Sequence, residues 1–381
     1  MQRSEFIKVL GLGTVGLITN GVFFSPAYNK DPGKRIKNWA WITTDLKIPD
    51  DDWLRRFAVM RNAGIDAVLP EIFNSREAYY ASQHLPVGGE WLERILPMAK
   101  KEGLEVHAWM WTMPCNITEI YEEHPEWYIV NGNGESSVVK PAYVDYYKFL
   151  CPSREEVHEF IEKRVKELAQ YDELDGIHLD YIRLPDVIIA EALQPRYDVV
   201  QDREYPEFDY CYCEVCRSKF KDQTGIDPLG LEDPAVNEKW RQFRYDSVTK
   251  LVNEKLVPMV RRHDKKVTAA VFPNWEAVRQ QWMAWDLDAF LPMLYHNFYF
   301  GDTDWIKHHT RKGVTALNDR APLYSGLFVP ELNPVALQEA VQVSLDAGAG
   351  GISLFHANAM DEYHWRSLHE TMNTLRKDLR R

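Results

Sequence analysis

Apolar and polar positions follow two alternating patterns along most of the chain. Short apolar runs typical of β-strands are each followed by a stretch in which apolar residues recur at helical spacing. Eight such apolar runs occur, at residues 36–43, 66–73, 104–111, 174–182, 266–272, 287–296, 321–329 and 350–357. Several of the helical stretches end in glycine before the next strand, as at Gly64, Gly103 and Gly350. The pattern therefore predicts consecutive β/α units.

Eight consecutive β/α units predict a protein of the α/β class with a single (β/α)8 barrel of the TIM type. No segment rich in Pro, Gly or Ser divides the units, so we assign residues 28–381 to one domain. Two connections are longer than a barrel needs. One covers residues 112–152, after the third strand, and the other covers residues 186–238, after the fourth. Both leave the carboxyl ends of strands, where barrel enzymes build their sites.

Residues 1–27 lie outside the β/α pattern. They begin with a short basic stretch, continue with an apolar one, and carry the small residues Ser25 and Ala27 at cleavage-site spacing. This organisation predicts an export signal and a mature protein that is periplasmic or secreted. The alternative is an uncleaved membrane anchor, although the apolar stretch is shorter than a membrane-spanning helix needs.

Composition narrows the class of function. The chain is 45% hydrophobic and 27% charged, as ordinary soluble globular proteins are. Its formal net charge of -12, with no basic block, argues against nucleic acid or an anionic membrane as a partner. Aromatic residues make up 13% of the chain. Sugar rings stack on exposed aromatic faces, although large cores use aromatic residues too. Nothing in the sequence indicates the oligomeric state.

The segment 174–186, LDGIHLDYIRLPD, has charged residues where a buried strand should be apolar. Asp180 falls at the carboxyl end of the fourth strand and should point into the mouth of the barrel. Tyr181 and Arg183 follow it, and Arg183 could both keep Asp180 ionised and reach a substrate oxygen. The alternative is an aspartate that caps the next loop or pairs with Arg183. His178 fits a hydrogen-bonded core histidine.

This motif, with GLEVHAWMW (103–111), LCPSREEV (150–157) and LDAFLPMLYH (287–296), resembles the bacterial family-10-like glycosylhydrolases. The likeness extends, in order, over nearly the whole predicted mature chain. It implies a (β/α)8 barrel that cleaves a polysaccharide or oligosaccharide and needs no cofactor for catalysis. Many members have two consecutive aspartates where this chain has Asp180 and Tyr181. A role of the second aspartate therefore does not carry over.

Glycoside hydrolysis generally needs two carboxyl groups, one to protonate the leaving oxygen and one to attack the anomeric carbon or activate water. Asp180 supplies one of them. Three glutamates near other strand ends are candidates for the second: Glu276 after the fifth strand, Glu71 in the second and Glu331 after the seventh. We rank Glu276 first because its strand is next to that of Asp180. Glu71 is second in this ranking, because its apolar neighbours could raise its pKa. For each of them the alternative is a surface glutamate.

Other side chains near strand ends are candidates for substrate binding. Trp109 and Trp111 alternate on the third strand and could equally fill the barrel interior, whereas Tyr295 and His296 fall where the sixth strand gives way to a loop. The predicted substrate-binding set is Tyr181, Arg183, Trp109, Trp111, Tyr295, His296 and Glu331.

Cys211, Cys213 and Cys216 form a C-x-C-x-x-C cluster in the long loop after the fourth strand. With Cys151 or Cys115 as a fourth thiolate they predict a structural zinc site. The alternative is a disulfide in an oxidising compartment. In either case we assign the cluster to holding the loop rather than to catalysis.

Two other functions stay open from the sequence. A barrel that binds carbohydrate without cleaving it would keep Asp180 but lack a second carboxyl group within roughly 10 Å. A hydrolase of carbohydrate substituents, such as a deacetylase, would need a metal-binding set of His and Asp, and no such set stands at ligand spacing in the sequence.

Overall fold

The computed structural model describes residues 35–378 of the protein, and its strands form one parallel sheet in the order β6-β5-β4-β3-β2-β1-β8-β7. The strands are β1 (Trp39–Ile42), β2 (Ala67–Phe73), β3 (Glu105–Trp111), β4 (Gly176–Asp180), β5 (Lys266–Val271), β6 (Ala289–Pro292), β7 (Tyr324–Phe328) and β8 (Gly351–Phe355). The Phe290 N–H donates to the Pro322 carbonyl at 3.1 Å and the Leu294 N–H donates to the Gly326 carbonyl at 2.9 Å. These bonds join the two outer strands and close the sheet. The predicted (β/α)8 barrel is confirmed.

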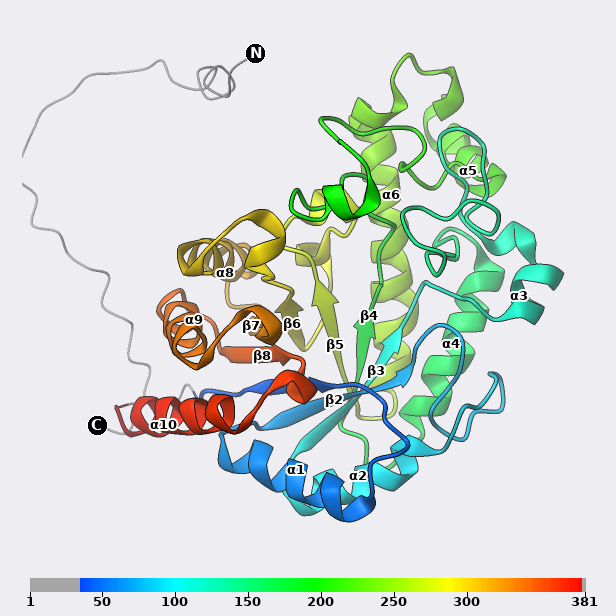
Figure 1. Cartoon of the computed structure of the whole chain (residues 1–381). Coiled ribbons are helices and arrows are strands. Elements are labelled where there is room, and N and C mark those ends of the chain that lie inside the picture. Colours follow the sequence, from blue (N-terminus) through cyan, green and yellow to red (C-terminus); the bar gives the residue numbers. More distant parts are fainter. Residues whose placement is uncertain (1–34, 379–381) are drawn as a thin grey trace, which may run out of the picture. The chain divides into compact units, whose positions relative to one another are not determined.

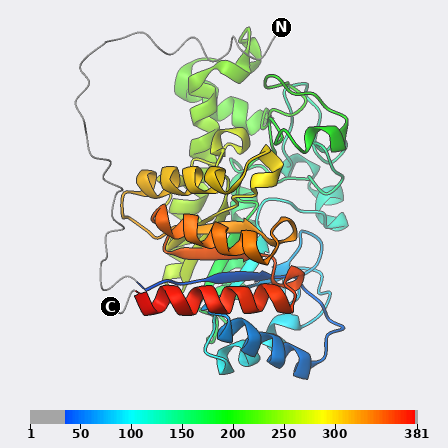
Figure 2. The ribbon, with the colours of Figure 1, turned by 60° about the vertical axis from the view of Figure 1, so that its left-hand side comes forward.

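Helices surround the strands (Figure 1). They are α1 (Asp50–Asn62), α2 (Trp91–Lys101), α3 (Thr118–Glu123), α4 (Glu155–Ala169), α5 (Glu214–Thr224), α6 (Glu238–Lys250), α7 (Val257–Arg261), α8 (Thr303–Leu317), α9 (Pro334–Asp346) and α10 (Glu362–Asp378). Figure 2 shows α8, α9 and α10 side by side along one side of the barrel. Each of these three helices directly follows a strand, as the alternation of patterns predicts.

The two long connections lie where the sequence predicts them. The β3–α4 connection contains the short helix α3, and the connection after β4 contains α5. The single long helix expected over residues 239–263 is instead divided into α6, a π-helical segment at Leu251–Leu256, and α7. Pro258 at the start of α7 explains the division. It has no N–H to donate, and its ring would clash with the carbonyl four residues earlier in a regular α-helix.

The barrel interior is filled by large side chains with one polar layer among them. Trp39, Trp41 and Trp109 are buried there with smaller apolar residues. Near them His178 Nδ1 lies 2.9 Å from the Thr268 hydroxyl, and the Trp41 indole N–H donates to His178 Nε2 at 3.3 Å. Because an indole only donates, Nε2 of His178 carries no proton and the ring is neutral. Burial lowers the pKa of His178 well below its usual value, which fits a core histidine.

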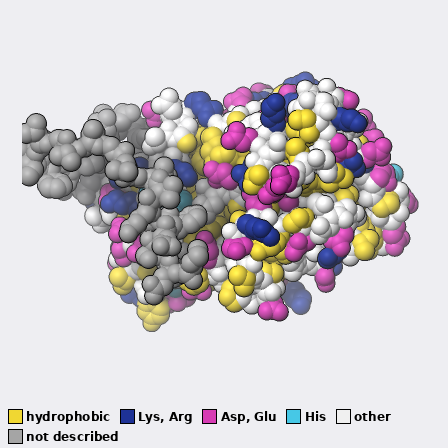
Figure 3. Space-filling model, turned by 90° about the horizontal axis from the view of Figure 1, so that it is seen from above, with side chains coloured by type: hydrophobic (Ala, Val, Ile, Leu, Met, Phe, Trp, Pro, Cys, Tyr) yellow, Lys and Arg dark blue, Asp and Glu magenta, His cyan; other side chains and the backbone are white. Residues whose placement is uncertain are grey.

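The outer surface carries charges of both signs. Asp and Glu side chains are interspersed with Lys and Arg on the face drawn in Figure 3. Within residues 35–378 we find no helix that combines the length and the apolar character needed to cross a bilayer. The expected export signal at residues 1–27 lies outside the described residues.

Substitution of Gly176, the first residue of β4, tests the packing of the barrel. An added Cβ there would lie 2.5 Å from Nδ1 of His107 and 2.6 Å from the Lys266 carbonyl. We therefore expect Gly176→Ala to lower the free energy of unfolding by about 1–3 kcal/mol, the usual cost of overpacking a core. Urea unfolding measures it. Gly230→Ala is the control, because a Cβ there meets nothing within 4 Å. Equal stabilities of the two variants would contradict the packing argument.

Candidate active site

A cavity of about 370 Å³ opens at the carboxyl ends of the strands. Strands β2, β3 and β4 contribute side chains to it, and so do the segments that follow β1, β3, β4, β5 and β6 and the end of β8. Its lining residues are Thr43, Glu71, Trp109, Trp111, Tyr147, Asp180, Tyr181, Arg183, Asp186, Ile189, Ala190, Leu193, Tyr197, Phe272, Met293, Tyr295, Phe298, Tyr299 and Phe355. Barrel enzymes build their sites at this end of the fold.

Asp180 is fixed by two hydrogen bonds at the end of β4. Its Oδ2 accepts the indole N–H of Trp109 at 2.9 Å, and its Oδ1 accepts the backbone N–H of Tyr181 at 2.7 Å. Burial raises the pKa of Asp180 to about 6, while both hydrogen bonds and the charge of Arg183 act in the opposite direction. At neutral pH the carboxyl group is therefore mostly ionised and held in one orientation.

Glu71 lies in β2, opposite Trp109 of β3, and lines the same cavity as Asp180. Burial raises the pKa of Glu71 to about 7, and the negative charge of Asp180 acts in the same direction. The side chain of Trp111 and the backbone of Thr44 oppose these effects. Close to neutral pH Glu71 is therefore protonated in a large fraction of molecules. The cavity holds one carboxyl group that is mostly ionised and one that can donate a proton.

Arg183 lines the cavity, but its hydrogen bonds do not go to Asp180. Its Nη1 donates to Oδ2 of Asp186 at 3.1 Å and to the Leu184 carbonyl at 2.9 Å, and its Nη2 donates to the Tyr147 hydroxyl at 3.2 Å. The alternative in which Arg183 pairs with Asp180 is not found; Arg183 forms an ion pair with Asp186, three residues further on. Arg183 lowers the pKa of Asp180 through its charge alone.

Aromatic rings form much of the cavity wall. Tyr181 packs against Trp111 in a tilted arrangement with ring centroids 4.5 Å apart, and its backbone adopts a left-handed conformation with φ of 50°. Across the cavity, Tyr295 packs against Phe355 and Phe298 at 5.6 and 5.7 Å. The buried Tyr295 hydroxyl has no hydrogen-bond partner within residues 35–378. Such a wall offers flat apolar faces together with an unused donor.

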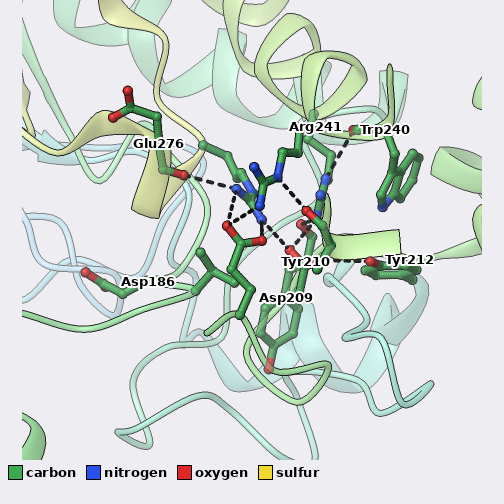
Figure 4. A network of polar contacts seen from close by, with 12 residues as sticks. Asp186, Asp209, Tyr210, Tyr212, Trp240, Arg241 and Glu276 are labelled. Atoms are coloured by element: carbon green, nitrogen blue, oxygen red, sulfur yellow. Dashed lines mark hydrogen bonds and ion pairs between the residues drawn. The ribbon is translucent and has the colours of Figure 1, made fainter. Parts of the chain in front are cut away.

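Three predicted site residues lie outside this cavity. Glu276 stands in a 3-10 turn after β5 with its side chain exposed. Its backbone carbonyl accepts a hydrogen bond from Arg279, which belongs to a network of charged side chains that includes Asp209. Figure 4 shows the Glu276 carboxylate pointing away from that network. Glu331 is exposed in the turn after β7, and His296 begins the turn after β6. None of the three lines the cavity.

Sequence reasoning missed several polar residues of the wall, among them Asp186 and Tyr147. Asp186 closes the 174–186 motif and is three residues from Arg183, a spacing that could have identified the ion pair. Tyr147 comes from the long β3–α4 connection, where no periodic pattern marks a position facing the cavity.

A group that could hold a metal lies elsewhere, in the long loops. Cys211, Cys213 and Cys216 meet Cys151, and the four Sγ atoms lie within 4.8 Å of one another. Cys115 is buried away from this group.

Comparison with known proteins relates the chain to carbohydrate-cleaving enzymes. Residues 55–317 match the model of a family described as "Glycosyl hydrolase-like 10". Over 232 residues, 55% of this chain, the sequence is 20% identical to the glycosyl hydrolase YngK of Bacillus subtilis (strain 168). That match spans 38% of the length of the Bacillus protein.

Solved structures show the same fold. The PgaB (BpsB) glycoside hydrolase domain from Bordetella bronchiseptica is similar with a TM-score of 0.67 and 15% sequence identity, over 88% of this chain and 99% of that one. A β-galactosidase from the haloarchaeon Halorubrum lacusprofundi is similar with a TM-score of 0.65 and 15% identity, over 88% of this chain and 57% of that one. At such identities the likeness shows the architecture alone.

The raised pKa of Glu71 can be tested through the pH dependence of stability. The pKa is about 7 in the folded protein, against an ordinary 4.5. Between these values the folded state binds more protons at Glu71 than the unfolded state, so stability is lost as the pH rises through this window. Glu71→Gln stays neutral and removes that loss. Urea unfolding gives the free energy of unfolding of each protein. We expect the value for the variant minus the value for the unmodified protein to increase from pH 4.5 to 7 and to stay constant above pH 7.

The control for this test is Glu276→Gln, the same chemical change on an exposed side chain outside the cavity. If the relative stability rises with pH equally in both variants, or in neither, the raised pKa assigned to the buried Glu71 is contradicted.

Proposed function

Because this chain belongs to the glycosyl hydrolase-like 10 family, we propose that it hydrolyses glycosidic bonds in a polysaccharide or oligosaccharide, with Asp180 and Glu71 as its two carboxyl groups. The observation that carries the proposal is that both groups line one cavity at the carboxyl ends of the barrel strands. The exposed Glu276, which the sequence ranks first, has no place in this assignment.

The two carboxyl groups differ in the way that the reaction requires. Glycoside hydrolysis needs an acid for the leaving oxygen and an ionised carboxylate that acts on the anomeric carbon, directly or through water. Glu71, with a pKa of about 7, can donate a proton near neutral pH, and Asp180, with a pKa of about 6, is mostly ionised there. We therefore assign Glu71 as the acid and Asp180 as the group that acts on the anomeric carbon.

The rest of the cavity wall suits a sugar ring. Trp111, Tyr181 and Phe355 present aromatic faces for the apolar side of a pyranose. The Tyr295 hydroxyl, which has no partner within residues 35–378, can bond an oxygen of the sugar. The positive charge of Arg183 is balanced by Asp186. In this assignment Arg183 holds the wall in place, and substrate specificity comes from the aromatic residues and the two carboxyl groups.

The N-terminal segment supports a location for this activity. A basic start, an apolar stretch and small residues at cleavage-site spacing are the features of an export signal. We propose that the protein acts outside the cytoplasm, in the periplasm or as a secreted enzyme, on glycans that it meets there.

Substitution of the carboxyl groups tests the proposed reaction. Asp180→Asn keeps the shape of the side chain and removes its charge, so turnover should fall roughly a thousandfold or more. Glu71→Gln should lose less on aryl glycosides than on natural glycans, because a good leaving group needs little protonation. Release of sugar from a panel of plant, host and microbial glycans and from aryl glycosides measures both.

Glu276→Gln is the matched control and should retain full turnover, because its side chain lies outside the cavity. Circular dichroism verifies that each variant is folded. Near-normal turnover in folded Asp180→Asn would overturn the assignment. Glycan binding without release of sugar by the unsubstituted protein would show a carbohydrate-binding barrel instead.

Export is tested separately. Expression of the full chain in a Gram-negative host should yield a periplasmic product shortened near Ala27. Mass spectrometry of the purified protein locates its first residue. A soluble cytoplasmic chain that retains residues 1–27 would remove the proposal about location and leave the proposed reaction untouched.

A further inference from the structure

Four cysteine side chains from two loops meet in a buried cluster. Cys151 comes from the connection between β3 and α4, and Cys211, Cys213 and Cys216 come from the connection after β4 and the first turn of α5. None of the four forms a disulfide. Within the described part of the chain, no His, Asp or Glu side chain belongs to the cluster.

The spacing of the sulfur atoms fits one tetrahedral metal ion. Thiolates bound at about 2.3 Å from zinc at tetrahedral angles lie about 3.8 Å from one another. Sγ of Cys151 lies 3.5 Å from Sγ of Cys213, 3.5 Å from Sγ of Cys216 and 3.8 Å from Sγ of Cys211. We propose that these four cysteines bind a single zinc ion in a closed site that serves structure and takes no part in catalysis.

The same distances argue against a disulfide within the cluster. Cys151 is equally far from Cys213 and Cys216 and only slightly farther from Cys211, so the arrangement favours no pair. A bond between any two would leave the remaining two buried as unpaired thiols. The structure also decides between the two candidates for the fourth ligand, because Cys151 lies in the cluster and Cys115 does not.

The position of α5 favours bound thiolates. Cys213 is the N-cap residue of this eleven-residue helix and Cys216 lies in its first turn. Free backbone N–H groups and the positive end of the helix dipole stabilise negative charge at this position. They offset part of the excess negative charge that four thiolates bring to one divalent ion.

Zinc at this position would fasten one long loop to the other. The Tyr212 N–H donates to the Val130 carbonyl at 2.7 Å, and the Gly132 N–H donates to the Pro206 carbonyl at 2.8 Å. The metal would therefore join segments that already touch through their backbones. Tyr147 and Tyr197, which line the cavity, belong to these same two loops.

A buried charged network surrounds Asp209, which is close in sequence to the cluster (Figure 4). Asp209, two residues before Cys211, pairs with Arg244 and with Arg279, whose Nη2 lies 3.0 Å from Oδ1 of Asp209. Nη1 of Arg279 also donates to Glu204 at 3.1 Å. All of these charges are paired within the loop and its neighbours, so the network holds the loop against the body of the barrel.

The 3-10 turn that precedes Arg279 also supports the cavity wall. The Leu184 N–H donates to the Val278 carbonyl at 3.1 Å, and the Val187 N–H donates to the Ala277 carbonyl at 2.8 Å. These bonds flank Asp186, the ion-pair partner of Arg183. A metal that fixes Cys211 would thereby help to fix the segment that bears Asp186.

Metal analysis of the full chain tests the proposal. The purified protein should contain about one zinc ion per chain, and X-ray absorption should show four sulfur neighbours at about 2.3 Å. Cys151→Ser and Cys213→Ser should lose most of the zinc and unfold at a lower temperature. Cys115→Ser, a buried cysteine outside the cluster, is the control and should keep its zinc.

The measurements on the unsubstituted protein do not depend on the folding of any variant. Iron in place of zinc, free thiols without metal, or disulfides that involve the four cysteines in alkylation and mass spectrometry would each overturn the proposal. Zinc content that is unchanged in folded Cys151→Ser would do the same. These results are independent of whether the protein cleaves a glycan.

Discussion

The hydrogen bond from the Trp109 indole to Asp180 connects the barrel interior to the cavity. The Trp109 ring is packed among inward-facing side chains, so the interior fixes its donor. In the ladder between strands, Trp109 lies opposite Glu71, and Trp111 lies opposite Asp180. The register of β3 therefore sets the positions of both carboxyl groups. Side chains held by a barrel strand keep their geometry better than those on loops do.

The periodic part of the fold could be predicted from the sequence, and so could the residues tied to it. Asp180 is predictable because its position at the end of a strand follows from counting along an apolar run. Glu71 follows the same logic, because it is two residues after Leu69, which faces the interior. The sequence ranks Glu276 above Glu71 because β4 and β5 are neighbours. Adjacency of strands does not determine where a residue in the following turn points, and Glu276 points outward.

The remaining features depend on contacts between distant loops. Nothing local in the sequence indicates that Tyr147 reaches Arg183, or that Cys151 rather than Cys115 joins the C-x-C-x-x-C segment. Such choices depend on how two long irregular segments fold over the same rim, and neither segment has a repeat that would reveal it. The charged network of Asp209, Arg244 and Arg279 has the same origin, since its members lie in three different parts of the chain.

Tyr181 has a backbone conformation that few residues with a side chain adopt. At φ of 50° its Cβ is crowded against its own backbone, at a cost on the order of 1–2 kcal/mol. Glycine would remove that strain and also the ring that packs against Trp111. Truncating a packed aromatic side chain costs about 3–5 kcal/mol, which is more than the strain that glycine would relieve. Evolution therefore has no small residue at this position that relaxes the backbone without loosening the cavity wall.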